Sequence, residues 1–412
     1  MLCAITHIFS VTVLPVCLTE EFMLKHLSVS HLAAGLTAVV VGYSSAVILV
    51  IQAAQSAGAS PAMVTSWLLA LGLGMGLSCI IFSLVYRIPV VTAWSTPGAA
   101  FLIMAAGAFE LSEVIGAFVT AGLLSFAAAQ SRWLSARIAA IPDGISAALL
   151  AGIVLPLCLN IFADIGDYPL LCALFIGLYI AGVRYFPRYV MLSLLVLALL
   201  AAAQSGAFAS STFSLTLAAP VWVTPTFSVQ ATISLALPLF LITMLSQNLP
   251  GMAILKAHNY QPNHRVVLSG LALIQMLTAP LGGFAYNYAA ITAAICMGDS
   301  AGEDRDQRYL AALIAGCAYI LVGLAAATVV TLFQAMPTVI VHLLAGLALL
   351  ATLQAALLRT VEDAGQRHPA IMTLLCTASG MTLFQLGSPV WGLLLGLLLY
   401  WLEQSKKTRP QR

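Results

Sequence analysis

Charged residues are scarce in this chain of 412 residues, because Asp, Glu, Lys and Arg together make up only 7% of it while apolar residues make up 61%. A water-soluble domain needs far more surface charge, so this composition excludes one. With a mean hydropathy of +1.03, the chain is predicted to be a polytopic protein of the lipid bilayer. A formal net charge of only +2 favours no nucleic-acid partner.

Motifs for bound metals, nucleotides and hydrolytic catalysis are also missing. The eight cysteines are scattered, without a Cys-x-x-Cys pair and without the Cys/His spacing of a metal site, so we expect no disulfide, metal or cofactor. The sequence has no His-Glu-x-x-His, Gly-x-Ser-x-Gly or Gly-x-x-x-x-Gly-Lys-Ser/Thr motif. We therefore predict that the chain is not an enzyme and is not driven directly by ATP.

The start of the chain lacks the basic residues with which a signal peptide begins. Its apolar run, from Leu2 to Leu18, is interrupted by His7 and Pro15. We interpret residues 1–27 as an N-terminal extension, in which residues 1–22 come from a start site assigned too far upstream. The alternative is that this stretch forms an extra helix.

Apolar segments of about 20 residues, the length of a membrane-spanning helix, are what the chain has in abundance. Fourteen can be counted, and the third and tenth are short. They cover residues 32–54, 61–85, 88–107, 111–130, 138–160, 168–183, 187–205, 229–255, 265–282, 283–298, 308–334, 337–358, 369–385 and 388–403. We therefore predict an all-α polytopic membrane protein with fourteen transmembrane segments.

Basic residues mark one side of the predicted membrane. If the N-terminus lies inside, all sixteen Lys and Arg residues fall at the inner ends of segments. The outer loops carry only acidic residues, such as Glu110 and Asp164, or no charge. If one segment were miscounted, every later loop would change sides and basic residues would appear on both sides of the membrane. This positive-inside pattern therefore supports the count. Both termini are therefore predicted to be cytoplasmic.

The two halves of the chain resemble inverted copies of each other. Seven segments per half is an odd number, so a second copy would cross the membrane in the opposite sense. Ile141-Pro142 in segment five and Met336-Pro337 in segment twelve are both followed by a Leu-Leu-Ala-Gly string. The same offset of about 195 residues aligns segment three with ten and segment one with eight.

These observations predict a linear organisation of two repeats. The parts are the extension 1–27, a first repeat 28–205, an outside connection 206–227, a second repeat 228–404 and a basic cytoplasmic tail 405–412. In the uncharged connection, a short strand or hairpin between Gly206 and Thr224 and an irregular cap are equal alternatives.

Segment three contains a break that organises the prediction of the site. Ser95 and Thr96 are good N-cap residues, Pro97 suits the first helical turn, and Gly98 with the small residues after it can continue a helix. We predict an extended half followed by a short helix whose N-terminus lies in mid-membrane. Such irregular backbone must line a cavity or be buried in protein, and a helix N-terminus favours an anion. A proline kink in an ordinary helix is the alternative.

Segment ten has a comparable break. Asn287 is a plausible N-cap for a helix over residues 289–296, and Tyr286 and Tyr288 flank it. Two half-helices would then point their N-termini at one cavity, where aromatic rings beside positive dipole ends suit a small, flat anion. The alternative places these tyrosines in an interfacial belt.

Segments one and eight add polar groups to the predicted site. Tyr43, Ser44 and Ser45 interrupt an apolar run in segment one, and Gln247 with Asn248 does so in segment eight. Two adjacent amides in an apolar span are costly unless they meet partners or a ligand. Each serine could equally serve helix packing.

At these motifs the sequence resembles the BenE family of benzoate/proton symporters. The matching stretches are 42–45, 92–100, 237–241, 246–248, 289–296 and 306–308, and the resemblance covers residues 28–404. It implies a secondary active transporter of the cell inner membrane that imports benzoate, or a similar small aromatic carboxylate, with a proton by alternating access. It also implies a fold similar to uracil permease and the sulfate permeases, with a core domain of segments 1–4 and 8–11 and a gate domain of segments 5–7 and 12–14.

On this basis we predict roles for the site residues. Ser95, Thr96 and Gly98 would hold the carboxylate through their N–H groups, and Tyr43, Tyr286 and Tyr288 would flank the ring. The residues predicted to bind substrate are Tyr43, Ser44, Ser45, Ser95, Thr96, Pro97, Gly98, Gln247, Asn248, Tyr286, Asn287 and Tyr288. Relatives of this fold often dimerise, so a homodimer is one expectation.

The sequence departs from the uracil permease pattern, which places acidic residues on segments eight and ten. Here neither segment offers an acid at the site, which fits an anionic substrate but leaves the proton carrier open. The candidates are Asp143, Glu113 and His342, although both acids could simply cap helices and the histidine could be a packing residue. A transporter of another planar substrate, such as a nucleobase, and an anion channel on the same fold are the alternative functions.

Overall fold

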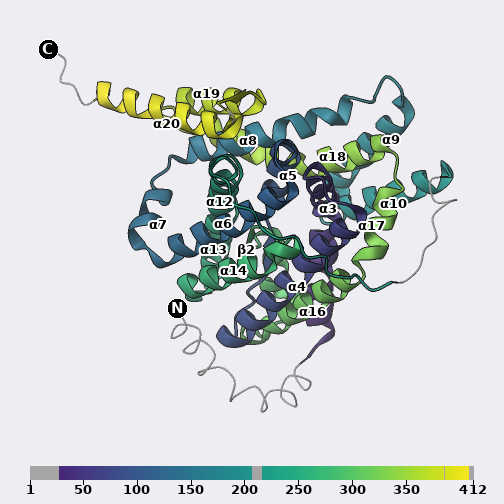
Figure 1. Cartoon of the computed structure of the whole chain (residues 1–412). Coiled ribbons are helices and arrows are strands. Elements are labelled where there is room, and N and C mark those ends of the chain that lie inside the picture. The colour runs from purple at the N-terminus through teal and green to yellow at the C-terminus, as the bar shows by residue number, and fades with distance from the viewer. Residues whose placement is uncertain (1–26, 207–215, 385, 408–412) are drawn as a thin grey trace.

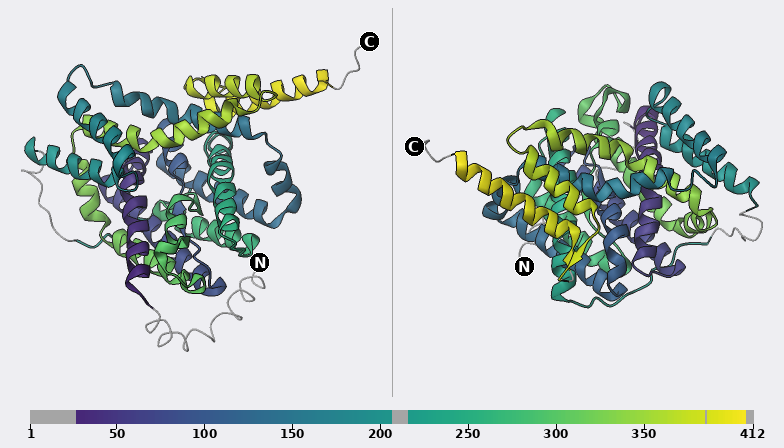
Figure 2. Two further views of the ribbon diagram at one scale, coloured as in Figure 1. Left: turned by 180° about the vertical axis from the view of Figure 1, so that it is seen from behind. Right: turned by 90° about the horizontal axis from the view of Figure 1, so that it is seen from above.

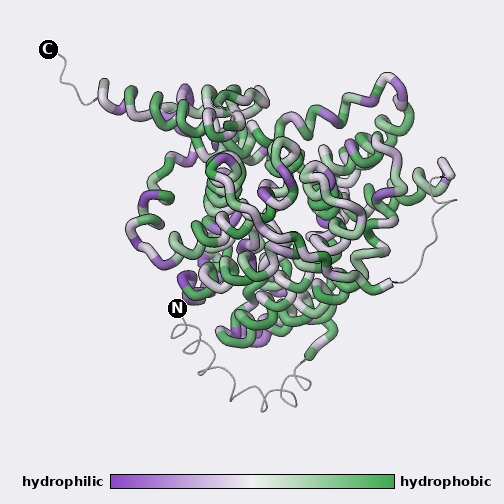
Figure 3. The backbone as a smooth tube through the Cα atoms, viewed as in Figure 1, coloured by the Kyte–Doolittle hydropathy of each residue, from purple (hydrophilic) through white to green (hydrophobic). Residues whose placement is uncertain are grey.

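Helices make up most of the computed structural model, which describes residues 27–206, 216–384 and 386–407 (Figure 1). The predicted N-terminal extension and the end of the basic tail lie outside the described residues. Hydrophobic residues predominate along most of the helices (Figure 3), as expected for a chain folded in lipid.

The described residues of the first half of the chain, from residue 27 on, form eight α-helices and one short strand. These elements are α3 Val29–Ser56, α4 Pro61–Tyr86, β1 Thr92–Trp94, α5 Thr96–Ala105, α6 Leu111–Gln130, α7 Arg132–Ala139, α8 Asp143–Leu159, α9 Pro169–Tyr185 and α10 Val190–Gln204. Single 3-10 turns, η2 Ala106–Ala108 and η3 Asn160–Phe162, follow α5 and α8.

The second half begins with one continuous but irregular helical segment. It comprises α11 Val229–Ala231, the π-helical turn η4 Thr232–Ala236, α12 Leu237–Thr243, the π-helical turn η5 Met244–Asn248 and α13 Leu249–Ala257. The second π-turn ends two residues before Pro250 and contains the two adjacent amides, Gln247 and Asn248. A proline cannot donate the usual helical hydrogen bond, which explains a widened turn before it.

The remaining elements complete the second half. They are α14 His264–Thr278, η6 Ala279–Leu281, β2 Tyr286–Tyr288, α15 Ile291–Met297, η7 Asp299–Ala301, η8 Arg305–Gln307, α16 Tyr309–Leu324, α17 Ala326–Gln334, α18 Thr338–Glu362, α19 Arg367–Ala378, β3 Thr382–Leu383, β4 Leu386–Gly387 and α20 Ser388–Lys407.

Eight helical stretches among the described residues are long and apolar enough to cross a membrane. They are Val29–Ser56, Pro61–Tyr86, Leu111–Gln130, Asp143–Phe162, Val229–Ala257, His264–Leu281, Arg305–Leu324 and Thr338–Glu362. The other predicted segments coincide with shorter elements, such as α9 and the β1–α5 pair. A polytopic membrane fold is therefore confirmed, whereas the number of fourteen crossings and the inverted repeat remain predictions.

The helices pack in two groups. In one, α4 lies along α16 and α14 along α6, with α3 against α16 and α5. In the other, α8 packs against α18 and α19, and α19 against α20. Figures 1 and 2 show α19 and α20 on α8 at one side of the molecule and α4 with α16 at the other. Contacts between α5 and α8 join the groups where the predicted site lies.

A strand pair at the centre of the first group lies where the sequence predicts the breaks in segments three and ten. Strands β1 and β2 are antiparallel, with Thr92 opposite Tyr288 and Trp94 opposite Tyr286. The pairing is extended by hydrogen bonds from the Ser95 N–H to the Ala285 carbonyl (2.9 Å) and from the Ala289 N–H to the Val91 carbonyl (3.0 Å). Both segments therefore consist of a strand followed by a short helix, so the alternative of a simple proline kink is wrong.

The connection after α10 has no helix or strand over its described part, residues 216–227. Its backbone is held by the surfaces it crosses, because Val221 N–H donates to Ser66 Oγ (2.9 Å) and Val223 N–H to the Pro280 carbonyl (2.8 Å). The irregular cap is therefore the correct alternative for these residues, and 207–215 lie outside the described part.

Candidate functional site

The N-terminus of α5 has the geometry that the sequence predicts. Ser95 is the N-cap, with an extended backbone, and its Oγ accepts a hydrogen bond from the Gly98 N–H at 3.0 Å. Ser95 is completely buried. A serine that follows a strand and precedes Pro97 ends the extended conformation and starts the helix, because proline fixes the helical φ and lacks an N–H.

Most of the donors at this helix end are already used. The Ser95 N–H is bonded to Ala285, Pro97 has none, and the Gly98 N–H is bonded to Ser95 Oγ. The Thr96 N–H is the one amide in the first turn without an acceptor among the described residues. An anion at α5 would therefore be held by Thr96, and the predicted use of the Ser95 and Gly98 N–H groups is wrong because the protein itself occupies them.

The helix after β2 begins later than the sequence predicts. Its first residue is Ile291, and the N-cap, Ala290, provides no side-chain hydrogen bond. Asn287 lies in β2, opposite Ala93, so its prediction as an N-cap is wrong. Strand pairing with a segment almost 200 residues away holds Asn287 extended, and the helix can start only where that pairing ends.

The hydroxyl of Tyr43 is buried without a hydrogen-bond partner. Its ring packs edge-on against Trp94 of β1, with 5.3 Å between the ring centroids. Trp94 immediately precedes the N-cap of α5, which places Tyr43 beside the open helix end. A buried hydroxyl without a partner costs free energy, so a ligand that accepts its hydrogen bond would recover that cost.

Two further unpartnered atoms belong to the same neighbourhood. Asn287 Oδ1 and Thr243 Oγ1 are both buried and bonded to no group among the described residues. Asn287 is on the strand pair. Thr243 lies one helical turn beyond Leu239, and a Cβ built on Gly98 would come within 2.8 Å of the Leu239 side chain. Thr243 was missed by sequence reasoning, although it lies four residues before Gln247 and so shares a helix face with it.

The two amides of η5 have different roles. Asn248 is buried, and its Oδ1 accepts a hydrogen bond from the Tyr288 N–H at 3.1 Å. It therefore ties segment eight to the strand of segment ten, which is one of the two roles predicted for the pair. Gln247 is half-buried and bonds to no side chain in the described chain, which leaves its amide free for a ligand.

The other aromatic and hydroxyl residues predicted for the site have their polar groups occupied. Tyr286 donates to the Ala70 carbonyl (2.8 Å), and Tyr288 Oη lies 3.1 Å from His264 Nδ1. Both tyrosines are buried, so their placement in an interfacial belt is wrong. Ser44 and Ser45 donate to carbonyls of their own helix, which agrees with the packing alternative. A contact between these four side chains and a ligand remains a prediction.

The three proton-carrier candidates lie in different settings. Asp143 is exposed in the first turn of α8, and Glu113 accepts a hydrogen bond from the Glu110 N–H (3.2 Å), which completes the cap of α6. His342 is not isolated, because its Nδ1 lies 2.7 Å from Asp164 Oδ2. Both side chains of that pair are 30% exposed, so water can reach the pair.

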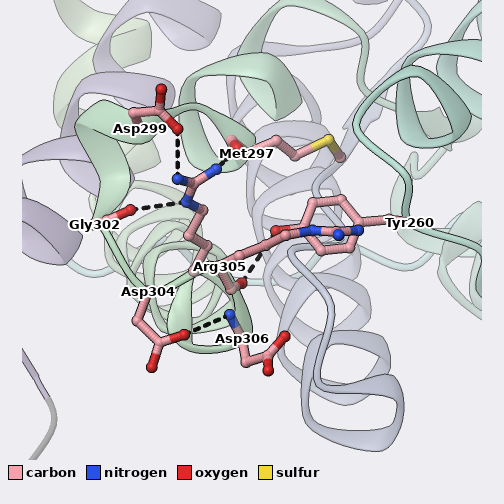
Figure 4. A network of polar contacts seen from close by, with 8 residues as sticks. Tyr260, Met297, Asp299, Gly302, Asp304, Arg305 and Asp306 are labelled. Atoms are coloured by element: carbon pink, nitrogen blue, oxygen red, sulfur yellow. Dashed lines mark hydrogen bonds and ion pairs between the residues drawn. The ribbon is translucent and has the colours of Figure 1, made fainter.

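A polar network fixes the far end of α15 (Figure 4). Arg308 donates to the carbonyls of Met297 (2.7 Å) and Gly302 (2.8 Å) and pairs with Asp299. Nearby, Arg305 lies over the ring of Tyr260, whose phenol has its pKa raised by burial. These contacts lie at the turn between α15 and α16 and hold the short helix from its C-terminal side, where cations complement the helix dipole.

The fold is shared with anion transporters of known structure. The structure of SLC26A9 superposes on 95% of this chain and 68% of its own, with a TM-score of 0.62 and 12% sequence identity. The transmembrane domain of the cyanobacterial bicarbonate transporter BicA superposes on 90% of this chain and 96% of its own, with a TM-score of 0.56 and 14% identity. Murine Slc26a9, an anion transporter in an inward-facing state, gives a TM-score of 0.60 at 13% identity, over 96% of this chain and 71% of that one. At these identities the likeness establishes the fold.

Sequence relatives establish the family. The chain is 37% identical to inner membrane protein YdcO of Escherichia coli K12 over 369 residues, which are 90% of this chain and 94% of that protein. It is 35% identical to the benzoate membrane transport protein of Acinetobacter baylyi over 375 residues, which are 91% and 95% of the two chains. The family model for BenE, described as benzoate membrane transport protein, matches residues 25–402. The chain therefore belongs to the BenE family of membrane transport proteins and is not an enzyme.

Proposed function

We propose that this chain is a secondary active transporter that imports benzoate, or a similar small aromatic carboxylate, together with a proton by alternating access. Membership of the BenE family and 35% identity to a benzoate membrane transport protein support the substrate class. The fold neighbours, which include an anion transporter and a bicarbonate transporter, support the transport of an anion on this scaffold.

The single observation that carries the proposal is a set of unused donors beside one helix N-terminus. The free Thr96 N–H lies at the positive end of α5, and the unpartnered hydroxyls of Tyr43 and Thr243 come from neighbouring helices. No carboxylate of the described residues belongs to this set. Donors without a competing negative charge suit a carboxylate, and the adjacent rings of Tyr43 and Trp94 suit an aromatic substrate.

The two packing groups correspond to the proposed moving parts. We infer a core domain of segments 1–4 and 8–11, which includes the strand pair, and a gate domain of segments 5–7 and 12–14 around α8 and α18. They would derive from inverted repeats over 28–205 and 228–404, with both termini cytoplasmic and fourteen crossings. Substrate would bind between α5 and α8, and movement of the core against the gate would expose it alternately. A homodimer belongs to this proposal.

Among the carrier candidates, we propose His342 with Asp164 as the proton-linked pair. Asp143 and Glu113 serve helix N-termini, whereas the imidazole of His342 lies 2.7 Å from the carboxylate of Asp164, and water can reach both side chains.

Uptake of labelled benzoate into proteoliposomes tests the proposal. An imposed inward proton gradient should drive accumulation above equilibrium, benzoate analogues should compete, and an uncoupler should abolish the accumulation. Benzoate flux that only equilibrates, with or without a gradient, would indicate the anion channel. Without any benzoate flux from correctly inserted protein, the proposed substrate would be rejected in favour of a nucleobase or an inorganic anion.

A further inference from the structure

Tyr288 connects the strand pair to a histidine that the proposed function does not use. Its hydroxyl lies 3.1 Å from Nδ1 of His264, the first residue of α14. The two rings meet edge to face, with centroids 5.6 Å apart and an interplanar angle of 82°. Tyr288 is only 1% exposed, whereas His264 is half-buried at the start of its helix.

Tyr288 is held along its whole length, so a change at its hydroxyl must reach the candidate site. Its N–H donates to Asn248 Oδ1, and its backbone pairs with Thr92 of β1. On its other side, helix α13 passes so closely that Gly251 has no space for a Cβ beside it. Loss of the contact with His264 would therefore loosen β2 against α13 and β1.

The other histidines of the described chain are engaged away from the strand pair. His31 caps α3 through Ser28, and His258 bonds to the Ile254 carbonyl of its own helix. His342 pairs with Asp164 and His368 with Glu403. Within this part of the chain, His264 is the histidine that contacts β1 or β2, and histidine is the side chain whose ordinary pKa lies closest to physiological pH.

The groups around His264 offer no anion to stabilise an imidazolium. From β2 it meets Tyr288, and from α4 the phenol of Tyr86 lies near that tyrosine. From α6, Gln130 is neutral and binds Arg265, a second cation next to His264. The turn η6, Ala279–Leu281, carries no ionisable residue. No carboxylate of the described residues forms an ion pair with His264.

We propose that His264 is a positioning residue that makes transport depend on pH at the membrane face where α14 begins, the predicted cytoplasmic face. The neutral imidazole accepts the Tyr288 O–H at Nδ1 and holds β2 in place. A proton added at Nδ1 removes that acceptor and creates a cation beside Arg265 without a carboxylate, so the ring turns to water and releases Tyr288. Acid arriving with the substrate would thus slow further import.

The test is exchange of labelled for unlabelled benzoate in proteoliposomes at equal pH on both sides, so that no gradient drives it. From pH 7.5 to 5.5 the neutral fraction of an imidazole falls by at most about tenfold, and wild-type exchange should fall with it. His264→Gln and Tyr288→Phe should each give a flat profile over this range. His368→Gln, at an exposed His–Glu pair, should keep the wild-type profile. Protein-free liposomes give the leak to subtract.

The role of His264 rests on the proposed function only because its test measures benzoate exchange. A second measurement, which needs no transport, separates the role of His264 from the proposed substrate. The thermal unfolding midpoint of the detergent-solubilised protein should fall between pH 7.5 and 5.5 by a larger amount in wild type than in His264→Gln. A wild type without benzoate exchange at any pH would reject the proposed substrate, and the unfolding midpoints would then decide the inference alone. If His264→Gln keeps the wild-type pH dependence in these measurements, the inference is overturned.

Discussion

Ser95 illustrates how much of a helix N-terminus the protein itself can occupy. The Ser95 N–H donates to the Ala285 carbonyl, and the Ser95 Oγ accepts the Gly98 N–H. Pro97 has no N–H, so Thr96 provides the one unused amide of the first turn among the described residues. This positive helix end is therefore less open than its sequence suggests, and under the proposed function its affinity for an anion would depend on one backbone donor together with nearby hydroxyls. Single atoms, more than residue types, decide what this site can bind.

Removing the Thr96 N–H without removing the helix should weaken substrate binding. Thr96→Pro deletes this donor at a position where helices accept proline, and Ser95 already has the extended backbone (ψ 100°) that a residue before proline needs. A hydrogen bond to a charged group contributes about 1.5–3 kcal/mol, so KM for benzoate should rise about tenfold or more. Initial uptake rates in proteoliposomes give this value.

Thr96→Val is the matched control, because it keeps the N–H and removes only the hydroxyl. Its KM should stay close to that of the wild type. Equal KM values for Thr96→Pro and wild type, with both proteins folded, would show that the α5 amide does not bind the substrate.

At the scale of elements, the structure explains which breaks the sequence could reveal. The start of α5 was predictable because its signals, Ser95 and Pro97, are adjacent in the chain and act locally. The start of α15 was not, because pairing with β1 holds Asn287 in a strand. Thr243 was missed because it, too, depends on a contact between distant segments. Its position at the site is set by the packing of α12 against α5, which periodicity within one helix cannot indicate.

Helix packing in the first group depends on glycines that allow close backbone contact. A Cβ on Gly72 of α4 would lie 2.7 Å from the Gly323 Cα of α16, so Gly72→Ala must push these helices apart. We expect a loss of about 1–3 kcal/mol in the free energy of unfolding, the usual cost of overpacking. The midpoint of thermal unfolding in detergent measures the effect.

Gly177→Ala in α9 is the control for this substitution. No atom lies within 4 Å of a Cβ built there, and alanine favours helix more than glycine does. Its midpoint should match or exceed that of the wild type. A midpoint for Gly72→Ala as high as that of Gly177→Ala would refute the close-packing argument.

At the scale of the whole molecule, the charge distribution predicts which loops share a side of the membrane. Gly166, in the loop after η3, is exposed with no neighbour within 4 Å of a built Cβ, and Glu362 is exposed at the end of α18. The positive-inside pattern places the first outside and the second inside. In intact cells a membrane-impermeant maleimide should label Gly166→Cys and spare Glu362→Cys.

Labelling of the parent chain, which has its own cysteines, gives the background for this experiment. Permeabilised cells should show equal labelling of the two variants, which confirms that both sites react. Labelling of Glu362→Cys in intact cells would contradict the predicted orientation, because the end of α18 would then lie on the outer side of the membrane.

The proposed proton coupling would be a property of the whole molecule, because a proton and a substrate bound at separate places would have to cross together. His342 and Asp164 join α18 to the loop before α9 on the predicted outer side, where the proton would enter under the proposed mechanism. His342→Gln removes the imidazole of this pair, while the glutamine amide can still donate a hydrogen bond to Asp164. We expect the variant to lose gradient-driven accumulation of benzoate and to keep benzoate exchange at equal pH, since exchange needs substrate binding but no net proton movement.

His368→Gln removes the histidine of the other His–acid pair, with Glu403, and should accumulate benzoate normally. Accumulation by His342→Gln equal to that of the wild type would exclude the pair as carrier, because a symporter without its proton-carrying group cannot convert a proton gradient into a substrate gradient.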